Sequence, residues 1–301
     1  MTRKRVFFIY APSYDEKIGG SIALHKLCDL INRQGSRAYL YPIGSSLKIS
    51  DIIFNPLSFI LQLFHKITTR IRFKTASTFN TPVALKFQNK NAIVIYPEIV
   101  SGNPLEANNV VRWLLHKPGF HTGLVEFNPS DLIFYFQEVF IDPSFNLNIG
   151  GKLQVMDIRS DIYTRTNFGV RSGSCYLLRK GRNREISHDL NNSIMIDDLS
   201  HKEVAKVFNQ SEFFISYDSY TLYSQYAALC GCISIVIPEL GVSREAWQPV
   251  DELRYGVSYG FGEIQLAKET QEKANHYLIG LEKEFTLSVL EFIGICTQYF
   301  S

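Results

Sequence analysis

One stretch of this sequence constrains the fold more than any other. Residues 213–239 read FFISYDSYTLYSQYAALCGCISIVIPE: an apolar segment, a polar turn, a helix-like segment that ends at Gly231, and a second apolar segment. A strand, a helix and a strand in this order form one unit of a parallel sheet, in which ligands bind at the carboxyl ends of the strands. The turn Tyr217-Asp218-Ser219-Tyr220-Thr221 is therefore predicted to face a ligand.

The same alternation recurs along the chain. Near the N-terminus a strand over 6–10 precedes Gly19-Gly20, a helix capped by Ser21 and a strand over 38–41. A helix is predicted over 104–115 because Pro104 suits a first helical position, and Ser200 with Glu203 fits a capping box. Further strands are predicted at residues 92–96, 132–136, 153–156, 174–178 and 193–196.

These patterns predict an α/β fold of two Rossmann-like domains, whose parallel sheets face each other across a cleft, followed by C-terminal helices. We expect an N-terminal domain over 1–165, a second over 166–265 and a helical tail over 266–301 that packs back toward the first domain. Helical spacing in the tail predicts an apolar stripe of Leu278, Leu281, Phe285, Val289 and Phe292.

Charge divides the chain unevenly. Residues 1–90 hold 14 Lys and Arg against 4 Asp and Glu, whereas the rest hold 17 against 25. A basic first part suits phosphates or an anionic membrane, or is a solvated surface. Segment 52–74, apolar and then basic, is either an interfacial helix that contacts anionic membrane or a helix that faces the core. No recognisable nucleic-acid-binding module accompanies these charges.

Several classes of protein find no support in the sequence. The five cysteines lack metal-ligand spacing, which favours reduced, buried thiols. No apolar run approaches the length of a spanning helix, and the N-terminal apolar run is too short for a signal peptide. We expect a cytoplasmic protein or one at the inner face of the membrane. The patterns GxxxxGK[ST], HExxH and Gly-x-Ser-x-Gly are absent.

At residues 199–239 the sequence resembles the donor-binding half of GT-B glycosyltransferases, especially the retaining nucleotide-sugar class of bacterial surface-polysaccharide biosynthesis. The shared pattern is a helix, a strand, an acidic residue, a short turn, a helix, a Cys-Gly pair and a strand. The resemblance implies that Asp218 approaches the donor sugar and that Ser219, Tyr220 and Thr221 form a phosphate-facing turn. Tyr226 stands where the family has the acidic residue that binds the nucleotide ribose.

Breaking a sugar–diphosphate bond requires stabilisation of a departing anion, which helix amides and cationic side chains supply without a metal. In the family, basic residues after the first strand of the second domain hold the diphosphate. This implies donor contacts for Arg179, Lys180 and Arg182, although such a basic loop is also typical of a solvated surface. Gly19 and Gly20 resemble the family's glycine-rich first loop, or mark only a tight turn.

Glu98 follows the predicted strand 92–96. Its carboxylate is a candidate general base on the acceptor hydroxyl if the enzyme inverts, or an acceptor-binding group, with Asn103, if it retains. The alternatives are a cap or a salt bridge to Arg112.

The expected function is transfer of a sugar from a nucleotide-diphosphate donor to a surface-glycan or lipid-linked acceptor. The nucleotide sugar is a co-substrate, and no cofactor or metal is expected. Two alternatives stay open at this point: a nucleotide-sugar epimerase, and a non-catalytic glycan-binding or scaffold subunit of the same fold.

Overall fold

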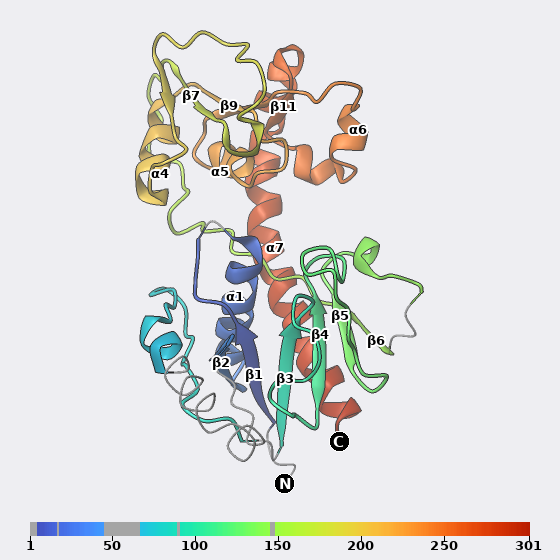
Figure 1. Ribbon diagram of the computed structural model, residues 1–301. Helices are drawn as coiled ribbons and strands as arrows, with labels where there is room; N and C mark the ends of the chain where they lie inside the picture. The colour runs from blue at the N-terminus through green and yellow to red at the C-terminus, as the bar shows by residue number, and fades with distance from the viewer. Residues whose placement is uncertain (1–4, 17, 45–66, 89–90, 145–147) are drawn as a thin grey trace. The chain divides into compact units, whose positions relative to one another are not determined.

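The computed structural model describes residues 5–16, 18–44, 67–88, 91–144 and 148–301. The chain divides into two compact units, one of residues 1–157 with 283–301 and the other of residues 158–282. Each unit is built on one parallel sheet, and the C-terminal helix α7 (Ile264–Tyr299) contributes residues to both units (Figure 1). This confirms the predicted α/β fold class of two parallel-sheet domains followed by a C-terminal helix. The cleft stays a prediction.

The first unit holds a six-stranded sheet in the order β2-β1-β3-β4-β5-β6, in which every neighbouring pair is parallel. Helix α1 (Gly19–Arg33) connects the first two strands in sequence. The central strands are buried along almost their whole length, which is why they read as continuous apolar runs. The strands are β1 (Val6–Ala11), β2 (Arg37–Pro42), β3 (Ala92–Pro97), β4 (Val110–Leu114), β5 (Leu132–Tyr135) and β6 (Asn148–Lys152), and a 3-10 turn, η1 (Glu138–Phe140), follows β5.

Side chains that alternate along these strands fill a core on each face of the sheet. On one face Phe292 of α7 meets Phe7 of β1 and Phe134 of β5, with ring centroids 5.9 and 4.7 Å apart. On the other face Phe8 and Tyr96 belong to a core cluster with residues of the following loops. The C-terminal part of α7 therefore belongs to the core of the first unit.

The second unit holds a five-stranded parallel sheet in the order β11-β10-β9-β7-β8. Its strands are β7 (Ser174–Leu177), β8 (Ser193–Met195), β9 (Phe213–Ser216), β10 (Ile233–Val236) and β11 (Val257–Tyr259). Its further elements are α4 (His201–Gln210), α5 (Tyr223–Leu229), α6 (Arg244–Trp247), η2 (Arg179–Gly181), η3 (Asp251–Arg254) and η4 (Phe261–Glu263).

Helix α4 covers one face of the second sheet, where Phe208 meets Phe214 of β9 at 5.0 Å between ring centroids. It begins with the predicted capping box: the Ser200 hydroxyl accepts from the Glu203 amide, and the Glu203 carboxylate accepts from the Ser200 amide at 2.8 Å. The predicted apolar stripe of α7 is likewise confirmed, since Leu278, Leu281, Phe285, Val289 and Phe292 are all buried.

Three sequence-based predictions of local structure are wrong. The helix predicted over 104–115 is a loop followed by strand β4, whose five residues are all buried, as in a central parallel strand. The strand predicted over 153–156 is irregular, and β6 lies just before it at Asn148–Lys152, where polar and glycine residues gave no apolar pattern.

The third error concerns Ser21, which does not cap α1. The helix begins at Gly19 with Ile18 at the N-cap and no side-chain cap. The Ser21 hydroxyl instead accepts from the Asp15 amide at 2.9 Å and donates to the Ser13 carbonyl at 3.1 Å. It thereby fixes the loop between β1 and α1.

The sequence predicted no spanning helix and gave membrane contact of segment 52–74 as one of two alternatives. Residues 52–66 of the segment 52–74 lie outside the described residues. Within the part of the chain that is described, no helix combines the length and the apolar character needed to cross a membrane.

Candidate functional site

The second sheet changes direction between β7 and β9. The chain leaves β7 toward β8 on one side, and it leaves β9 toward β10 on the other. Such a switch point, at the carboxyl ends of the strands, is where ligands bind in open α/β sheets. Leu177 and Ser216, the last residues of these two strands, are register partners. The basic loop after β7 and the predicted turn after β9 therefore start side by side.

The two segments are in direct contact. A Cβ atom at Gly181 would lie 2.2 Å from the carbonyl oxygen of Tyr217, so only glycine fits here without a shift of the backbone. Arg184 adds a second link, because its Nη1 donates to the Tyr217 carbonyl at 2.9 Å and to the Ser219 hydroxyl at 3.3 Å. Its Nη2 donates to the carbonyls of Ile237, at 3.0 Å, and Pro238. One guanidinium thus joins the ends of β9 and β10.

Arg184 was not predicted as a site residue. The sequence shows only a run of cations, and the carbonyl groups that Arg184 binds come from two distant strands. Since these acceptors engage its planar fork of donors, Arg184 shapes the switch point rather than offering a free charge to a ligand.

The other three cations of the loop differ in their surroundings. The Arg179 guanidinium lies over the ring of Tyr223, 4.7 Å from its centroid, and its Nη2 donates to the Tyr223 hydroxyl at 3.2 Å. Arg182 is 69% exposed, 3.9 Å from a carboxylate oxygen of Asp197, and Lys180 is exposed. Lys180 and Arg182 are thus the cations of this loop most accessible to an anion.

The backbone at the start of this loop is held in an uncommon conformation. Arg179 has a φ of +36°, a region that non-glycine residues rarely adopt. The Asp197 carboxylate accepts from the Leu178 amide at 2.9 Å and from the Arg179 amide at 2.8 Å. Strained backbone that neighbouring groups hold in place is typical of functional sites.

The turn after β9 contains the predicted acidic residue in a buried position. Asp218 is 6% exposed, and its carboxylate accepts from the Tyr220 amide at a long 3.4 Å. Trp247 donates to the Ser219 carbonyl at 2.6 Å, and the Thr221 hydroxyl accepts from the Tyr223 amide at 3.3 Å. The Tyr220 side chain is exposed. The turn is thus fixed largely through its backbone, and it contains one buried carboxylate.

Tyr226 lies in the hydrophobic core, one helical turn beyond Tyr223. Its ring stacks on Tyr163 with centroids 4.0 Å apart and planes 7° from parallel. Tyr163 in turn meets the Nδ1 atom of His201 through its hydroxyl at 2.5 Å. The contact of Tyr226 with a nucleoside stays a prediction.

The first sheet has its own switch point, between β1 and β3, because the chain leaves β1 toward β2 and leaves β3 toward β4. Gly19 and Gly20 begin the helix that follows β1. Among the described residues, a Cβ atom at Gly19 would meet nothing within 4 Å, and one at Gly20 would meet only Leu115, at 3.7 Å. The backbone around this glycine pair is therefore open to the approach of a ligand.

Glu98 lies at the end of β3, next to the same point. It is 6% exposed, and its Oε2 atom accepts from the Leu115 amide at 3.1 Å. Burial raises the pKa of the Glu98 carboxyl, while hydrogen bonds from backbone amides and the nearby His121 partly offset this rise. Through Leu115, the structure brings Glu98 and Gly20 to one edge of the sheet.

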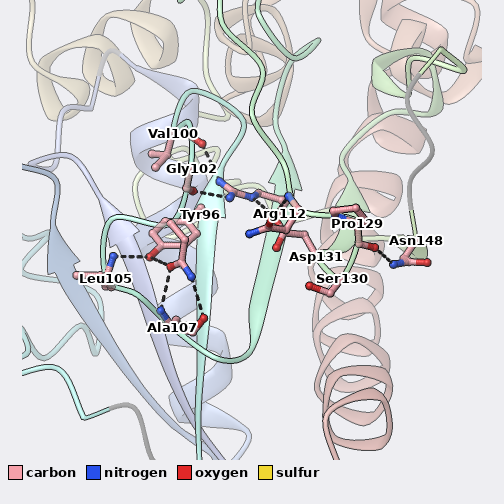
Figure 2. Close-up of polar contacts among 12 residues, drawn as sticks. Tyr96, Val100, Gly102, Leu105, Ala107, Arg112, Pro129, Ser130, Asp131 and Asn148 are labelled. Atoms are coloured by element: carbon pink, nitrogen blue, oxygen red, sulfur yellow. Dashed lines mark hydrogen bonds and ion pairs between the residues drawn. The ribbon is translucent and has the colours of Figure 1, made fainter.

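The alternative partner of Glu98, Arg112, is engaged elsewhere. Its Nε donates to Asp131 at 2.8 Å, and its other nitrogens donate to the carbonyls of Val100, at 2.7 Å, and Gly102, at 2.5 Å (Figure 2). All of these groups are buried or partly buried. Asp131 supplies the counter-charge, and the two carbonyl contacts of Arg112 hold in place the loop that follows Glu98 in sequence.

Asn103 secures the same loop through its side chain. Its side-chain oxygen accepts from the Tyr96 hydroxyl at 2.9 Å and from the Ala107 amide at 3.0 Å, and its amide donates to the Ala107 carbonyl at 2.8 Å. These bonds give Asn103 a structural role in the loop, and its predicted contact with an acceptor stays untested.

Two histidines that the sequence did not single out lie near Glu98. His116 follows β4, and its ring centroid lies 5.1 Å from His121 and 4.3 Å from Phe120. Its Nδ1 atom is buried and makes no hydrogen bond with the described residues. The sequence feature that could have identified these two histidines is their position shortly after a buried strand of the sheet. Among the residues that the structure describes, no group of three or more His, Cys, Asp or Glu is arranged to hold a metal ion.

Comparisons with known proteins give only distant structural similarity. No family model and no curated protein matches the sequence. Sucrose-phosphate synthase from Thermosynechococcus elongatus aligns with a TM-score of 0.43 at 9% identity, covering 98% of this chain and 97% of that chain. T4 phage BGT, solved in complex with its UDP-glucose substrate, gives 0.42 at 9%, covering 99% and 97%. The spinosyn rhamnosyltransferase SpnG gives 0.32 at 10%, covering 97% and 96%. At these TM-scores the three structures carry no weight for the function of this chain.

Proposed function

We propose that this protein is a glycosyltransferase that moves a sugar from a nucleotide-diphosphate donor to a surface-glycan or lipid-linked acceptor. We assign the donor to the second unit and the acceptor to the first. The assignment of the reaction comes from the sequence resemblance over residues 199–239 to GT-B glycosyltransferases of the retaining class. The structure supports the proposal through the arrangement of residues within each unit, taken separately.

The observation that carries the proposal is the switch point of the second sheet. There the basic loop after β7 packs on the turn after β9, through Gly181 on Tyr217 and through Arg184 on Ser219. The loop that carries Lys180 and Arg182, both exposed, thus contacts the turn that contains the buried Asp218. Cations fixed at the carboxyl edge of a parallel sheet suit a diphosphate.

In this proposal the cations act on the leaving group. When the bond between the sugar and the diphosphate breaks, the oxygen of the diphosphate gains negative charge, and positively charged side chains nearby lower the energy of that state. Lys180 and Arg182 supply this charge directly, and Arg179 adds to it from its place over Tyr223. We propose that the reaction needs no metal ion. We propose that Asp218, on the neighbouring strand end, contacts the sugar.

The first unit supplies a group for the acceptor. A general base works best when its pKa lies near the working pH, and burial raises the pKa of Glu98 in that direction. If the reaction inverts the anomeric centre, Glu98 takes the proton of the acceptor hydroxyl. If the reaction retains it, Glu98 binds the acceptor.

Calorimetric titration of the protein with a panel of nucleoside diphosphates tests the donor assignment. At least one of them is expected to bind, and Lys180→Ala should weaken that binding about ten- to hundredfold, as for the loss of one charge-assisted hydrogen bond. Lys206→Ala removes an exposed lysine of α4 and serves as the matched control. Absence of binding by every nucleoside diphosphate would remove the proposal.

Turnover is tested separately, with the matching nucleotide sugars and a set of lipid-linked and free glycan acceptors. Product should form only when donor and acceptor are both present, and Asp218→Asn should reduce it without loss of folding. Product from donor alone would instead indicate an epimerase or a hydrolase.

A further inference from the structure

A cavity of about 290 Å³ lies in the second unit, away from the switch point. Several of its lining residues, Gly173, Ser174, Asn192 and Phe213, stand at or just before the amino ends of strands. The donor cations and Asp218 lie at the carboxyl ends of the same strands. The cavity is therefore separate from the proposed donor site.

The floor of the cavity is the face of the sheet that α4 does not cover. Phe214 of β9 points to α4, so its neighbours Phe213 and Ile215 point to the opposite face. Ile235 of β10 is the register partner of Ile215 and lines the same surface. The β7–β8 connection contains no α-helix, and its residues His188 and Asp189 line the cavity.

Aromatic and apolar side chains also close one side. Phe261 and Ile264, around the start of α7, also line the cavity, and Phe261 is 47% exposed. An engineered apolar cavity of about 150 Å³ can hold benzene. A space of 290 Å³ therefore has room for one aromatic ring and a short polar arm.

The charge on the rim is negative. Among the described residues that line the cavity, Asp189 and Glu212 carry carboxylates and none is Lys or Arg. Asp189 accepts through Oδ1 from the backbone and side chain of Asn191, both at 2.9 Å, which fixes its carboxylate. Within the described part of the chain, the Glu212 carboxylate makes no hydrogen bond or ion pair.

The remaining polar groups of the rim are engaged with one another. His188 meets the Ser193 hydroxyl at 3.3 Å and the Tyr217 hydroxyl at 2.8 Å, and Ser174 donates to Ser193 at 2.8 Å. Burial lowers the pKa of His188, which the neighbouring Asp189 partly offsets, so the ring favours its neutral form. The rim therefore favours a cation.

We propose that this cavity is a second binding site, which takes a small aromatic molecule that bears a protonated amine. The ring lies on the apolar floor beside Phe261, and the ammonium group is held by Glu212 and Asp189.

A matched series of probes tests the charge preference: 2-phenylethylamine, 2-phenylethanol and 3-phenylpropionate, titrated into the full-length protein by calorimetry. The amine should bind most tightly and the carboxylate least, and added salt should weaken the amine alone. Glu212→Gln and Asp189→Asn should each weaken the amine about two- to fivefold, the range of one partly exposed ion pair, and leave the alcohol unchanged.

The control variant is Glu185→Gln, which removes an exposed carboxylate of the same loop that does not line the cavity. It should leave all three affinities unchanged. A Phe261→Ala variant, at a half-exposed position that tolerates change, should weaken the amine and the alcohol together. No binding of the amine, equal binding of all three probes, or an amine affinity that Glu212→Gln and Asp189→Asn leave unchanged would each overturn the proposal. A failure of nucleotide binding would not affect it.

Discussion

Gly181 packs directly on the backbone of Tyr217, so closely that a single added methyl group would lie 2.2 Å from the Tyr217 carbonyl oxygen. This contact joins the loop after β7 to the turn after β9. It exists because neighbouring parallel strands end in register, which leaves almost no space between the segments that follow them. The position of the loop cations therefore depends on a residue that has no side chain.

Gly181→Ala is expected to displace the loop. Over-packing of a tight site costs about 1–3 kcal/mol in the free energy of unfolding, and the cations beside Gly181 would move with the backbone. Urea denaturation should show the loss of stability, and calorimetry should show weaker binding of nucleoside diphosphates. Gly280→Ala, in α7, is the control, because a Cβ there meets no atom of the described chain within 4 Å and alanine favours helix. A Gly181→Ala variant as stable as the wild type would contradict the packing described here.

Variants of Arg184 and Arg182 should separate an effect on stability from an effect on nucleotide binding. Arg184→Ala removes the donors that hold the ends of β9 and β10, and we expect a loss of about 2 kcal/mol in the free energy of unfolding. Arg184→Lys should recover only part of it, since an ammonium lacks the planar fork. Arg182→Ala, at an exposed side chain, should leave stability nearly unchanged and weaken nucleotide binding. If Arg182→Ala lowered stability and Arg184→Ala weakened only nucleotide binding, the structural role would belong to Arg182 and the binding role to Arg184.

The elements that the sequence predicted well are those whose signals are local. Strand β9, helix α5 and the capping box of α4 each follow from a short run of residues: a buried apolar stretch, a helix closed by Gly231, and Ser200 with Glu203. Local hydrogen bonds and burial of short apolar runs act within a few residues, so the sequence displays them directly.

The elements that the sequence missed depend on distant partners. Arg112 is charged and sits within residues of helical spacing, yet β4 buries it fully because Asp131, 19 residues later, supplies the counter-charge. Arg184 likewise finds its acceptors on Ile237 and Pro238, 53 and 54 residues away. A local sequence pattern does not show such distant partners. For that reason neither strand β4 nor the role of Arg184 between β9 and β10 was predicted.

The raised pKa of Glu98 predicts a pH-dependent difference between the wild type and Glu98→Gln. A carboxyl whose pKa is higher in the folded than in the unfolded state contributes stability that is fully present below the unfolded pKa and is lost as pH rises through the folded pKa. Glutamine does not titrate. The free energy of unfolding of Glu98→Gln, relative to the wild type, should therefore increase from about pH 4 upward and then level off.

Urea denaturation of both proteins across pH 4–8 measures this difference. Glu203→Gln is the control with the opposite sign, because hydrogen bonds from Ser200 lower the pKa of the exposed Glu203. Its relative stability should decrease as pH rises toward the ordinary carboxyl pKa of about 4.3 and stay constant above about pH 5, so its curve is extended down to about pH 3. Parallel curves for Glu98→Gln and the wild type would contradict burial of an ionisable Glu98.

Tyr226→Phe tests whether this buried tyrosine also contacts the nucleoside. Phenylalanine keeps the ring stacked on Tyr163 at 4.0 Å and removes only the hydroxyl group, so the core should be retained. If the hydroxyl binds the nucleotide ribose, the affinity for the nucleoside diphosphate should fall about two- to tenfold, the value of one hydrogen bond. Tyr226→Ala would not answer the question, because loss of the ring costs about 3–5 kcal/mol and disrupts the unit itself. Tyr39→Phe, in the first sheet, controls for the loss of a tyrosine hydroxyl elsewhere. An unchanged affinity in a stable Tyr226→Phe protein would assign Tyr226 to the core alone.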